Sequence, residues 1–289
     1  MEKTQVRSGI ISPLIIIALV IVIVIGGLLT WQQVRQTISS QTNYSTATNG
    51  YGIGKKSTVS KTTKALWRFD GQNWQGKVAT GANCDDNAPL TSSLSQDLSL
   101  ATARLYPGQT RGNDYKAHGG LIFDNQRNLV RINLPVDATL YEGSRYLEMG
   151  EEQILIDLQT DCGWLLRFDH LAKVGPELAD SIAELPAPLA DQSQTHPIDP
   201  VRLQAGTLIA SEIGFKKLNR TTVDFGLYNL KQKNQVSQTA NWQKEHSELQ
   251  QLGAHGVCWF DYLIPADQAL VNKLPAGDSA AGALSDYCE

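Results

Sequence analysis

An uncharged run of twenty residues lies close to the start of the chain. Residues 10–29 read IISPLIIIALVIVIVIGGLL, in which only Ser, Pro and Gly interrupt the apolar side chains. A helix needs roughly 20 such residues to cross a bilayer. A cleaved secretory signal would have a shorter apolar stretch ending at a small-residue site of the A-x-A kind, which GGLLTWQQ does not offer. The sequence therefore predicts a transmembrane helix over residues 10–30, with Trp31 as an interfacial anchor.

The charges on either side of this run predict the orientation of the chain. Lys3 and Arg7 precede the run, whereas Arg35 follows it closely. Basic residues favour the cytoplasmic side of a membrane. We therefore expect residues 1–9 in the cytoplasm and a single-pass protein of the cell membrane whose C-terminal domain is extracytoplasmic.

All four cysteines, Cys84, Cys162, Cys258 and Cys288, lie beyond the apolar run. An even number of cysteines in an oxidising compartment is typical of disulfide-bonded domains. Four cysteines allow three pairings, and the sequence alone does not select one. We favour Cys258 with Cys288 because they flank one terminal segment. Four buried free thiols are the alternative, and the reverse membrane orientation would favour it.

The composition separates a polar linker from a folded part. Residues 31–64 are rich in Ser, Thr, Gln, Asn and Gly and show no apolar periodicity, which predicts a flexible stalk. The chain has 289 residues, 42% of them hydrophobic, so it can form a substantial core. Its formal net charge of -4 provides no basic surface for a polyanion. Nucleic acid is therefore not expected as a partner.

Short strand-like segments dominate residues 118–230. They carry β-branched or aromatic residues and are bounded by Gly, Asp, Asn or Pro, as the strands of a barrel or sandwich usually are. One segment, GPELADSIAELPAP, instead spaces Leu178, Ile182 and Leu185 as a helix does, and it predicts a helical insertion. Residues 191–200 predict an exposed loop. The strand segments are GLIFD, LVRINLPV, ATLYEG, QILIDLQT, WLLRFDHL, GTLIASEI and TTVDFGLYNL.

The regions on either side of this block are less regular. Residues 65–117 hold turn signals and short apolar pieces, and they predict an irregular lead-in with one helix in SQDLSLATARLY (95–106). Residues 231–289 form a C-terminal extension, in which NWQKEHSELQQLG and PADQALVNKL predict helices. The expected fold class is therefore mainly β, with a helical insertion and a helical C-terminal extension, preceded by one transmembrane helix.

The order of motifs in residues 118–230 resembles the lysostaphin-type (LytM) zinc endopeptidases of metallopeptidase family 23, which cut peptide cross-links in bacterial cell walls. HGGLIF resembles the family's His-x-Gly-x-Asp strand, INLPVDATLYEG its Ala-Pro-x-x-Gly-x-Val turn, and ILIDLQTDCGWLLRFDHL its strand pair ending in Tyr-x-His-Leu. LQAGTLIASEIG resembles the Gly-x-x-Ile-x-x-x-Gly step, and TVDFGL falls where the family has His-x-His-Phe-Glu. The resemblance implies a lysostaphin-like β-barrel or sandwich.

The resemblance also implies a degenerate metal site. His118 matches the family's first zinc ligand, but Ile122 stands where the ligating aspartate belongs, and Asp224 where the ligating histidine belongs. His170 matches one of the two histidines that assist the reaction, and Thr222 replaces the other. A candidate groove formed by His118, His170, Asp224 and Thr222 is therefore implied.

The replacement by isoleucine decides whether zinc is expected. A hydrolytic zinc site needs three fixed protein ligands and an open position whose water is acidified. Isoleucine cannot coordinate a metal, so we expect no cofactor, and zinc remains an alternative in which Asp224 and His170 join His118 as ligands. Each histidine also has a structural interpretation, as a hydrogen-bonding residue of a half-buried strand. We interpret Gly119, Gly120, Gly143 and Gly206 as glycines of turns or of places where strands crowd together.

Three functions are compatible with these features. The leading hypothesis is a membrane-anchored cell-envelope protein whose inactive peptidase-like domain binds peptidoglycan or regulates a cell-wall hydrolase, as the resemblance to degenerate family members implies. The second is an active metallo-endopeptidase with an altered metal site. The third is a pilin-like or architectural surface protein processed after Gly9, although Leu14 stands where such signals usually carry Glu.

Overall fold

The computed structural model describes residues 66–112, 114–123, 128–277 and 285–288. The chain divides into two units, residues 1–57 and 58–289, and every described residue belongs to the second. The transmembrane helix and the stalk predicted over residues 10–64 lie outside the described residues. Within the described ranges, no helix is both long and apolar enough to span a membrane.

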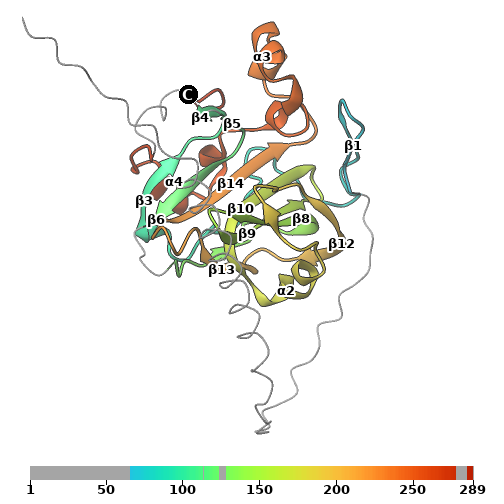
Figure 1. The fold of residues 1–289 in the computed structure, drawn as a ribbon. Helices are drawn as coiled ribbons and strands as arrows, with labels where there is room; N and C mark the ends of the chain where they lie inside the picture. Colours follow the sequence, from blue (N-terminus) through green and yellow to red (C-terminus); the bar gives the residue numbers. More distant parts are fainter. Residues whose placement is uncertain (1–65, 113, 124–127, 278–284, 289) are drawn as a thin grey trace, which may run out of the picture. The chain divides into compact units, whose positions relative to one another are not determined.

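The described unit is mainly β, as predicted, with 39% strand and 18% helix. Ten strands form one large mixed sheet, seven of them along its main path (Figure 1). All pairings in this sheet are antiparallel except that of β11 with β8. The main path runs through β11 (Leu189–Ala190), β8 (Ala138–Glu148), β9 (Glu151–Gln159), β10 (Trp164–Val174), β14 (Thr221–Asn229), β6 (Gly119–Phe123) and β3 (Ala101–Leu105).

Three further strands join this path from the side. Strand β12 (His196–Leu203) pairs with β8, and β13 (Leu208–Ile213) pairs with both β10 and β7 (Ile132–Asn133). Two separate hairpins lie outside the large sheet: β1 (Arg68–Phe69) with β2 (Trp74–Gln75), and β4 (Gln109–Arg111) with β5 (Asp114–Lys116).

Strand β14 shows how the sheet separates its two faces. Val223, Phe225 and Leu227 alternate along it and are buried in the main hydrophobic core. Because neighbouring residues of a strand point to opposite faces, Thr222 and Asp224 point away from that core. The second face of β14 therefore carries polar groups, and the candidate residues lie there.

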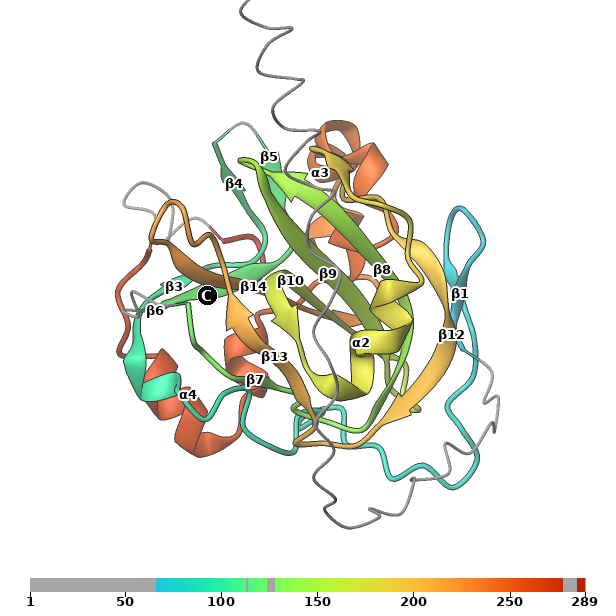
Figure 2. The same cartoon turned by 60° about the horizontal axis from the view of Figure 1, so that its bottom comes forward.

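The helices agree with the sequence prediction in part. Helix α2 (Pro176–Ala183) is the predicted insertion; it begins with Pro176 and buries Leu178 and Ile182, and Figure 2 shows it beside β8 and β13. Helix α4 (Pro265–Val271) begins at the predicted proline. Helix α3 (Ala240–Glu245) is shorter than predicted. Short 3-10 turns complete the set: Leu98–Leu100, Val236–Gln238, Ser247–Leu249, Gly253–His255 and Trp259–Tyr262.

Two sequence predictions about local structure were wrong. The helix expected over residues 95–106 is instead a 3-10 turn followed by β3. Strand β3 pairs with β6, and this tertiary pairing overrides the local helix propensity of the segment. The loop expected over residues 191–200 becomes strand β12 from His196 onward, paired with β8. Pro197 lies in this strand, which is compatible with its place at the side of the sheet.

The cysteines form two disulfides. Cys258 is bonded to Cys288, as predicted, and Cys84 is bonded to Cys162. The first joins the C-terminal residues to the core, in which Cys258 and Trp259 are buried. The second ties the segment before β3 to the turn between β9 and β10. The lead-in is therefore covalently attached to the strand block, whereas the Cys258–Cys288 bond lies within the C-terminal extension.

Candidate functional site

The carboxylate of Asp224 meets His118 at the start of β6. Nε2 of His118 lies 2.9 Å from Oδ2 of Asp224, a hydrogen-bonding distance. The strand register explains the contact, because Asp224 pairs with Gly120, two residues after His118. A Cβ at Gly120 would lie 2.7 Å from Oδ1 of Asp224 and 2.5 Å from the carbonyl O of Val223. Glycine is therefore required here, in agreement with its interpretation as a strand-crowding residue.

A backbone irregularity brings His170 to the same carboxylate. Asp169 pairs with Asp224, but the next paired residue of β10 is Leu171, whose partner is Ile213 on another strand. Between them, His170 has a φ of 60°, which is uncommon for a non-glycine residue. Its Nε2 lies 3.7 Å from Oδ2 of Asp224. A bulge of this kind redirects a side chain, and here it redirects an imidazole toward the site.

A second set of polar groups surrounds His170. The hydroxyl of Tyr146 donates to Oδ1 of Asp169 at 2.7 Å and lies 3.4 Å from Nδ1 of His170. The backbone N–H of His170 donates to the same Oδ1 at 2.7 Å. Oε2 of Glu148 lies 3.8 Å from Nδ1 of His170. The imidazole therefore has acidic or hydroxyl neighbours on both of its ring nitrogens.

Arg111, on the β4–β5 hairpin, supplies a fixed positive charge. Its Nη2 lies 3.9 Å from Oδ2 of Asp224. The guanidinium is held by carbonyl groups, since Nη1 donates to Tyr106 at 2.8 Å and Nη2 to His118 at 3.3 Å. Sequence reasoning missed Arg111, Tyr146 and Asp169, because none of them belongs to a motif that could have indicated a site.

The charge state of Asp224 follows from these neighbours. Burial by itself raises the pKa of its carboxyl, but the imidazoles of His118 and His170 and the guanidinium of Arg111 outweigh burial and hold the pKa well below its usual range. The Asp224 side chain is 10% exposed, and those of His118 and His170 are 18% and 16% exposed. The site is therefore a carboxylate anion beneath two imidazoles that solvent can reach.

The fourth candidate, Thr222, has a different environment. It is buried in β14, and its hydroxyl donates to the carbonyl O of Leu121 at 3.3 Å. Its partner in the sheet is Ile122, and Cδ1 of Ile122 lies beside Gly277. The structure therefore brings His118, His170 and Asp224 together and gives the Thr222 hydroxyl a bond within the sheet.

The donor atoms of this cluster are of kinds that bind metal ions. Two imidazoles and one carboxylate are donors that zinc accepts. As they lie, however, Asp224 already accepts a hydrogen bond from His118, and Arg111 approaches the same oxygen. Across the described part of the chain, no group of three His, Cys, Asp or Glu side chains is arranged to hold a metal ion. The arrangement does not fit a zinc ion without movement of these side chains.

The polar face continues along the sheet as a row of charged and polar groups. Arg167, two residues before Asp169 on β10, donates from Nε and Nη2 to the two carboxylate oxygens of Asp157 at 2.8 and 2.6 Å. Beside them lies Tyr228, fully buried, whose hydroxyl has no partner among the described residues. The β1–β2 hairpin covers this end through Trp74, which packs in one cluster with Tyr228. Because the Asp157 carboxylate is already paired with Arg167, the other end of the row, at His118 and His170, is the candidate for ligand contact.

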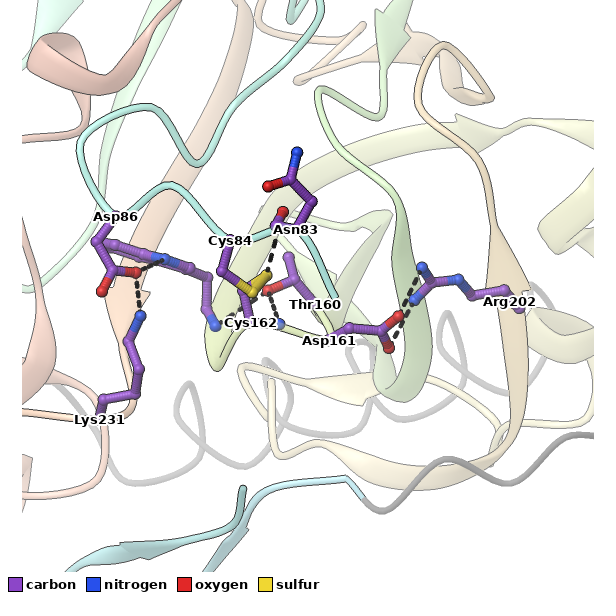
Figure 3. Close-up of a disulfide and its surroundings, with 9 residues drawn as sticks. Asn83, Cys84, Asp86, Thr160, Asp161, Cys162, Arg202 and Lys231 are labelled. Carbon is purple, nitrogen blue, oxygen red and sulfur yellow. Dashed lines mark hydrogen bonds and ion pairs between the residues drawn. A yellow bond between two sulfur atoms is a disulfide. The ribbon is translucent and has the colours of Figure 1, made fainter. Parts of the chain in front are cut away.

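A hollow in the described surface lies elsewhere, at the Cys84–Cys162 disulfide, whose surroundings are drawn in Figure 3. Its volume is about 440 Å³, and Thr160, Asp161 and Arg202 are among the residues that line it. Two guanidinium nitrogens of Arg202 each donate to Asp161 at 3.2 Å. Arg202 of this hollow is paired with the carboxylates of Asp161 and Asp137, and we place the candidate site at Asp224.

Comparison with models of protein families gives no match, and the same is true of curated proteins and of solved structures. The similarity to LytM-type endopeptidases therefore stays a prediction from sequence motifs. Function has to be inferred from the residues of this chain and their contacts.

Proposed function

We propose that this chain is a membrane-anchored protein of the cell envelope whose outer domain binds cell-wall peptide without hydrolysing it, or regulates a hydrolase through the same groove. In this proposal the sheet is a lysostaphin-like one that has lost its metal. The observation that carries the proposal is the contact of 2.9 Å between His118 and Asp224, next to Arg111. The carboxylate serves there as an internal counter-ion.

The absence of hydrolysis is inferred from how this carboxylate is used. A hydrolytic zinc ion needs ligands that are free to coordinate and a position open to water. Here the lone pairs of Oδ2 face a hydrogen-bonded imidazole and a guanidinium group. A metal ion would have to displace the imidazole of His118 from Oδ2 and lie close to the guanidinium of Arg111.

The location outside the cytoplasm has independent support. Two disulfides connect segments that are 78 and 30 residues apart. Such bonds form and persist in oxidising compartments such as the periplasm and the cell surface. This is consistent with the anchor and orientation predicted from residues 10–30 and from the flanking charges.

The ligand class is inferred from the groups that solvent can reach. His118 and His170 can each donate or accept a hydrogen bond, and the Glu148 side chain beside them is 36% exposed. A cell-wall peptide offers amides, carboxylates and amino groups, which match a surface that mixes donors with acceptors. The partly exposed imidazoles would then bind the peptide directly, with Asp224 fixing the ring of His118.

Titration of the full-length chain with soluble peptidoglycan fragments tests this proposal. We expect the melting temperature to rise with fragment concentration, and we expect His118→Ala to abolish the rise. His196→Ala is the matched control, because His196 lies on β12 opposite Gly143, outside the contacts of Asp224. If the fragments leave the melting temperature unchanged and crosslinking recovers no hydrolase, the proposal is wrong.

A second candidate function is an active metallo-endopeptidase with an altered site. The observation in its favour is that two imidazole nitrogens converge on one carboxylate oxygen, at 2.9 and 3.7 Å. Metal analysis of the purified chain separates the two functions. Stoichiometric zinc that is lost in His118→Ala would support the peptidase, and a metal-free protein would exclude it.

A further inference from the structure

Residues 285–288 form a short C-terminal strap that is bonded to the core. Cys288 is joined to Cys258, which is buried next to Trp259. The hydroxyl of Tyr287 donates to the carbonyl O of Gly253 at 2.6 Å. The strap is therefore fixed at one side to the core by a covalent bond and a hydrogen bond.

On its other side the strap holds the base of the β4–β5 hairpin. Oγ of Ser285 donates to the carbonyl O of Pro107 at 2.5 Å, and the backbone N–H of Asp286 donates to the carbonyl O of Gly108 at 2.6 Å. Tyr115, on β5, donates its hydroxyl to Oδ2 of Asp286 at 2.9 Å. Both ends of the hairpin therefore contact the strap.

Gly108 shows how closely the two segments pack. It has a φ of +68°, and a Cβ built there would lie 2.6 Å from the ring of Tyr287. Gly256 presents the same crowding on the core side, where a Cβ would lie 2.4 Å from that ring. The aromatic ring of Tyr287 is thus enclosed between hairpin and core by two glycines.

This hairpin carries the positive charge of the candidate site. Nη1 of Arg111 donates to the carbonyl O of Tyr106, the residue directly before Pro107, which the strap holds. From that anchor Nη2 reaches His118 O and Asp224 Oδ2. A displacement of residues 106–108 would therefore move the guanidinium away from Asp224.

We infer that the C-terminal strap, locked by Cys258–Cys288, is a positioning element that sets the distance of Arg111 from Asp224 and so the shape of the groove. Asp286 and Tyr287 do not contact Asp224 in this account; they position Arg111 through their contacts with Tyr115 and Gly108 of the hairpin. The effect on ligand affinity rests on the proposed function, whereas the mechanical coupling of strap, hairpin and His118 does not. The two can be tested separately.

The experiment compares two double variants of the full-length chain. Cys258→Ser with Cys288→Ser opens the strap, and Cys84→Ser with Cys162→Ser removes the other disulfide as a control. Hydrogen exchange by mass spectrometry reports the amides of residues 106–118, and diethyl pyrocarbonate labelling reports the accessibility of His118. In the strap variant we expect exchange over residues 108–116 to rise by at least about tenfold, because several hydrogen bonds are lost, and His118 labelling to accelerate.

The control variant loses the disulfide that closes the longer loop, so its global stability falls. Under conditions in which it stays folded, we expect the exchange of residues 108–116 relative to the core amides of β14, and the labelling of His118, to stay at the wild-type level. Equal changes in the two variants would show general destabilisation and overturn the inference, as would an unchanged hairpin in the strap variant. If that variant does not fold, Asp286→Ala with the disulfide intact gives the answer, and Asp286→Asn should restore the wild-type pattern because its amide oxygen can still accept from Tyr115. Failure of peptidoglycan fragments to bind the wild-type chain would contradict the proposed function and leave these readouts valid.

Discussion

Gly120→Ala tests whether crowding between β6 and β14 maintains the candidate site. The added Cβ would lie 2.5 Å from the carbonyl O of Val223 and 2.7 Å from Oδ1 of Asp224. An ordinary carbon–oxygen contact is about 3.3 Å, so the strands must separate locally by about 0.8 Å. One contact is with backbone, which a rotamer change cannot relieve.

The expected cost follows from known effects of overpacking. Extra methyl groups in well-packed regions cost about 1–3 kcal/mol, and contact with backbone places this site at the upper end. Replacement of glycine by alanine also restricts the unfolded chain, which recovers up to about 1 kcal/mol. We therefore expect a net loss of about 2 kcal/mol in the free energy of unfolding.

Urea unfolding of the full-length chain, followed by tryptophan fluorescence, measures this loss, and the imidazole NMR signals of His118 report its contact with Asp224. Gly206→Ala is the control: Gly206 has a φ of +85° and no heavy atom within 4 Å of an added Cβ. The control should lose only the roughly 1 kcal/mol of a left-handed backbone and leave His118 unchanged. Stability of Gly120→Ala within about 0.5 kcal/mol of wild type, with unaltered His118 signals, would refute the reasoning.

Three further predictions concern other parts of the molecule. Replacing Cys84 and Cys162 by serine opens a loop between residues 78 apart. The chain-entropy relation predicts a loss of about 4.5 kcal/mol, measurable as a lower urea midpoint. Asp157→Ala leaves Arg167 without its carboxylate and should cost about 3 kcal/mol, whereas the double variant with Arg167→Met should be less destabilised than Asp157→Ala alone. Burial lowers the pKa of His255 by more than its hydrogen bonds to backbone carbonyls raise it. Above pH 6.5 the imidazole is neutral in both the folded and the unfolded state. Below pH 6.5 the unfolded chain binds a proton at His255 that the folded chain does not bind. Stability should therefore fall as pH drops below about 6.5, and His255→Gln should reduce this slope in unfolding experiments between pH 5 and 7.

The elements that the sequence predicted correctly are those in which local pattern and tertiary environment agree. TTVDFGLYNL has β-branched and aromatic residues, and it is the buried strand β14. GPELADSIAELPAP places its leucines and isoleucine on one face, and it is helix α2. In SQDLSLATARLY the spacing of Leu98 and Leu105 is compatible with a helix, but these side chains enter the core from a turn and a strand. The partner strand β6, and not the local spacing, decides that structure.

The candidate site shows the same limit. His118, His170 and Asp224 were predicted together because they occupy motif positions. The structure places Nε2 of each histidine within 3.7 Å of Oδ2 of Asp224. Arg111 reaches that oxygen from a hairpin whose position depends on residues 285–288, far away in sequence. No local pattern encodes such a contact. The charge that opposes a metal ion at this cluster is therefore visible only in three dimensions.

The position of Arg111 has an energetic consequence for metal binding. A zinc ion bound to Oδ2 of Asp224 would lie roughly 2 Å from that oxygen, and hence about 6 Å or less from the guanidinium 3.9 Å beyond it. At an effective dielectric constant of 20, a double and a single positive charge at that separation repel by roughly 5 kcal/mol. Structural zinc binds with about 10–16 kcal/mol, so Arg111 would remove a third or more of that free energy. A peptide amide that bonds to His118 or His170 meets no such repulsion, and the same charge that opposes the metal keeps Asp224 ionised as an acceptor for His118. The cluster is therefore better suited to a hydrogen-bonded ligand than to an ion.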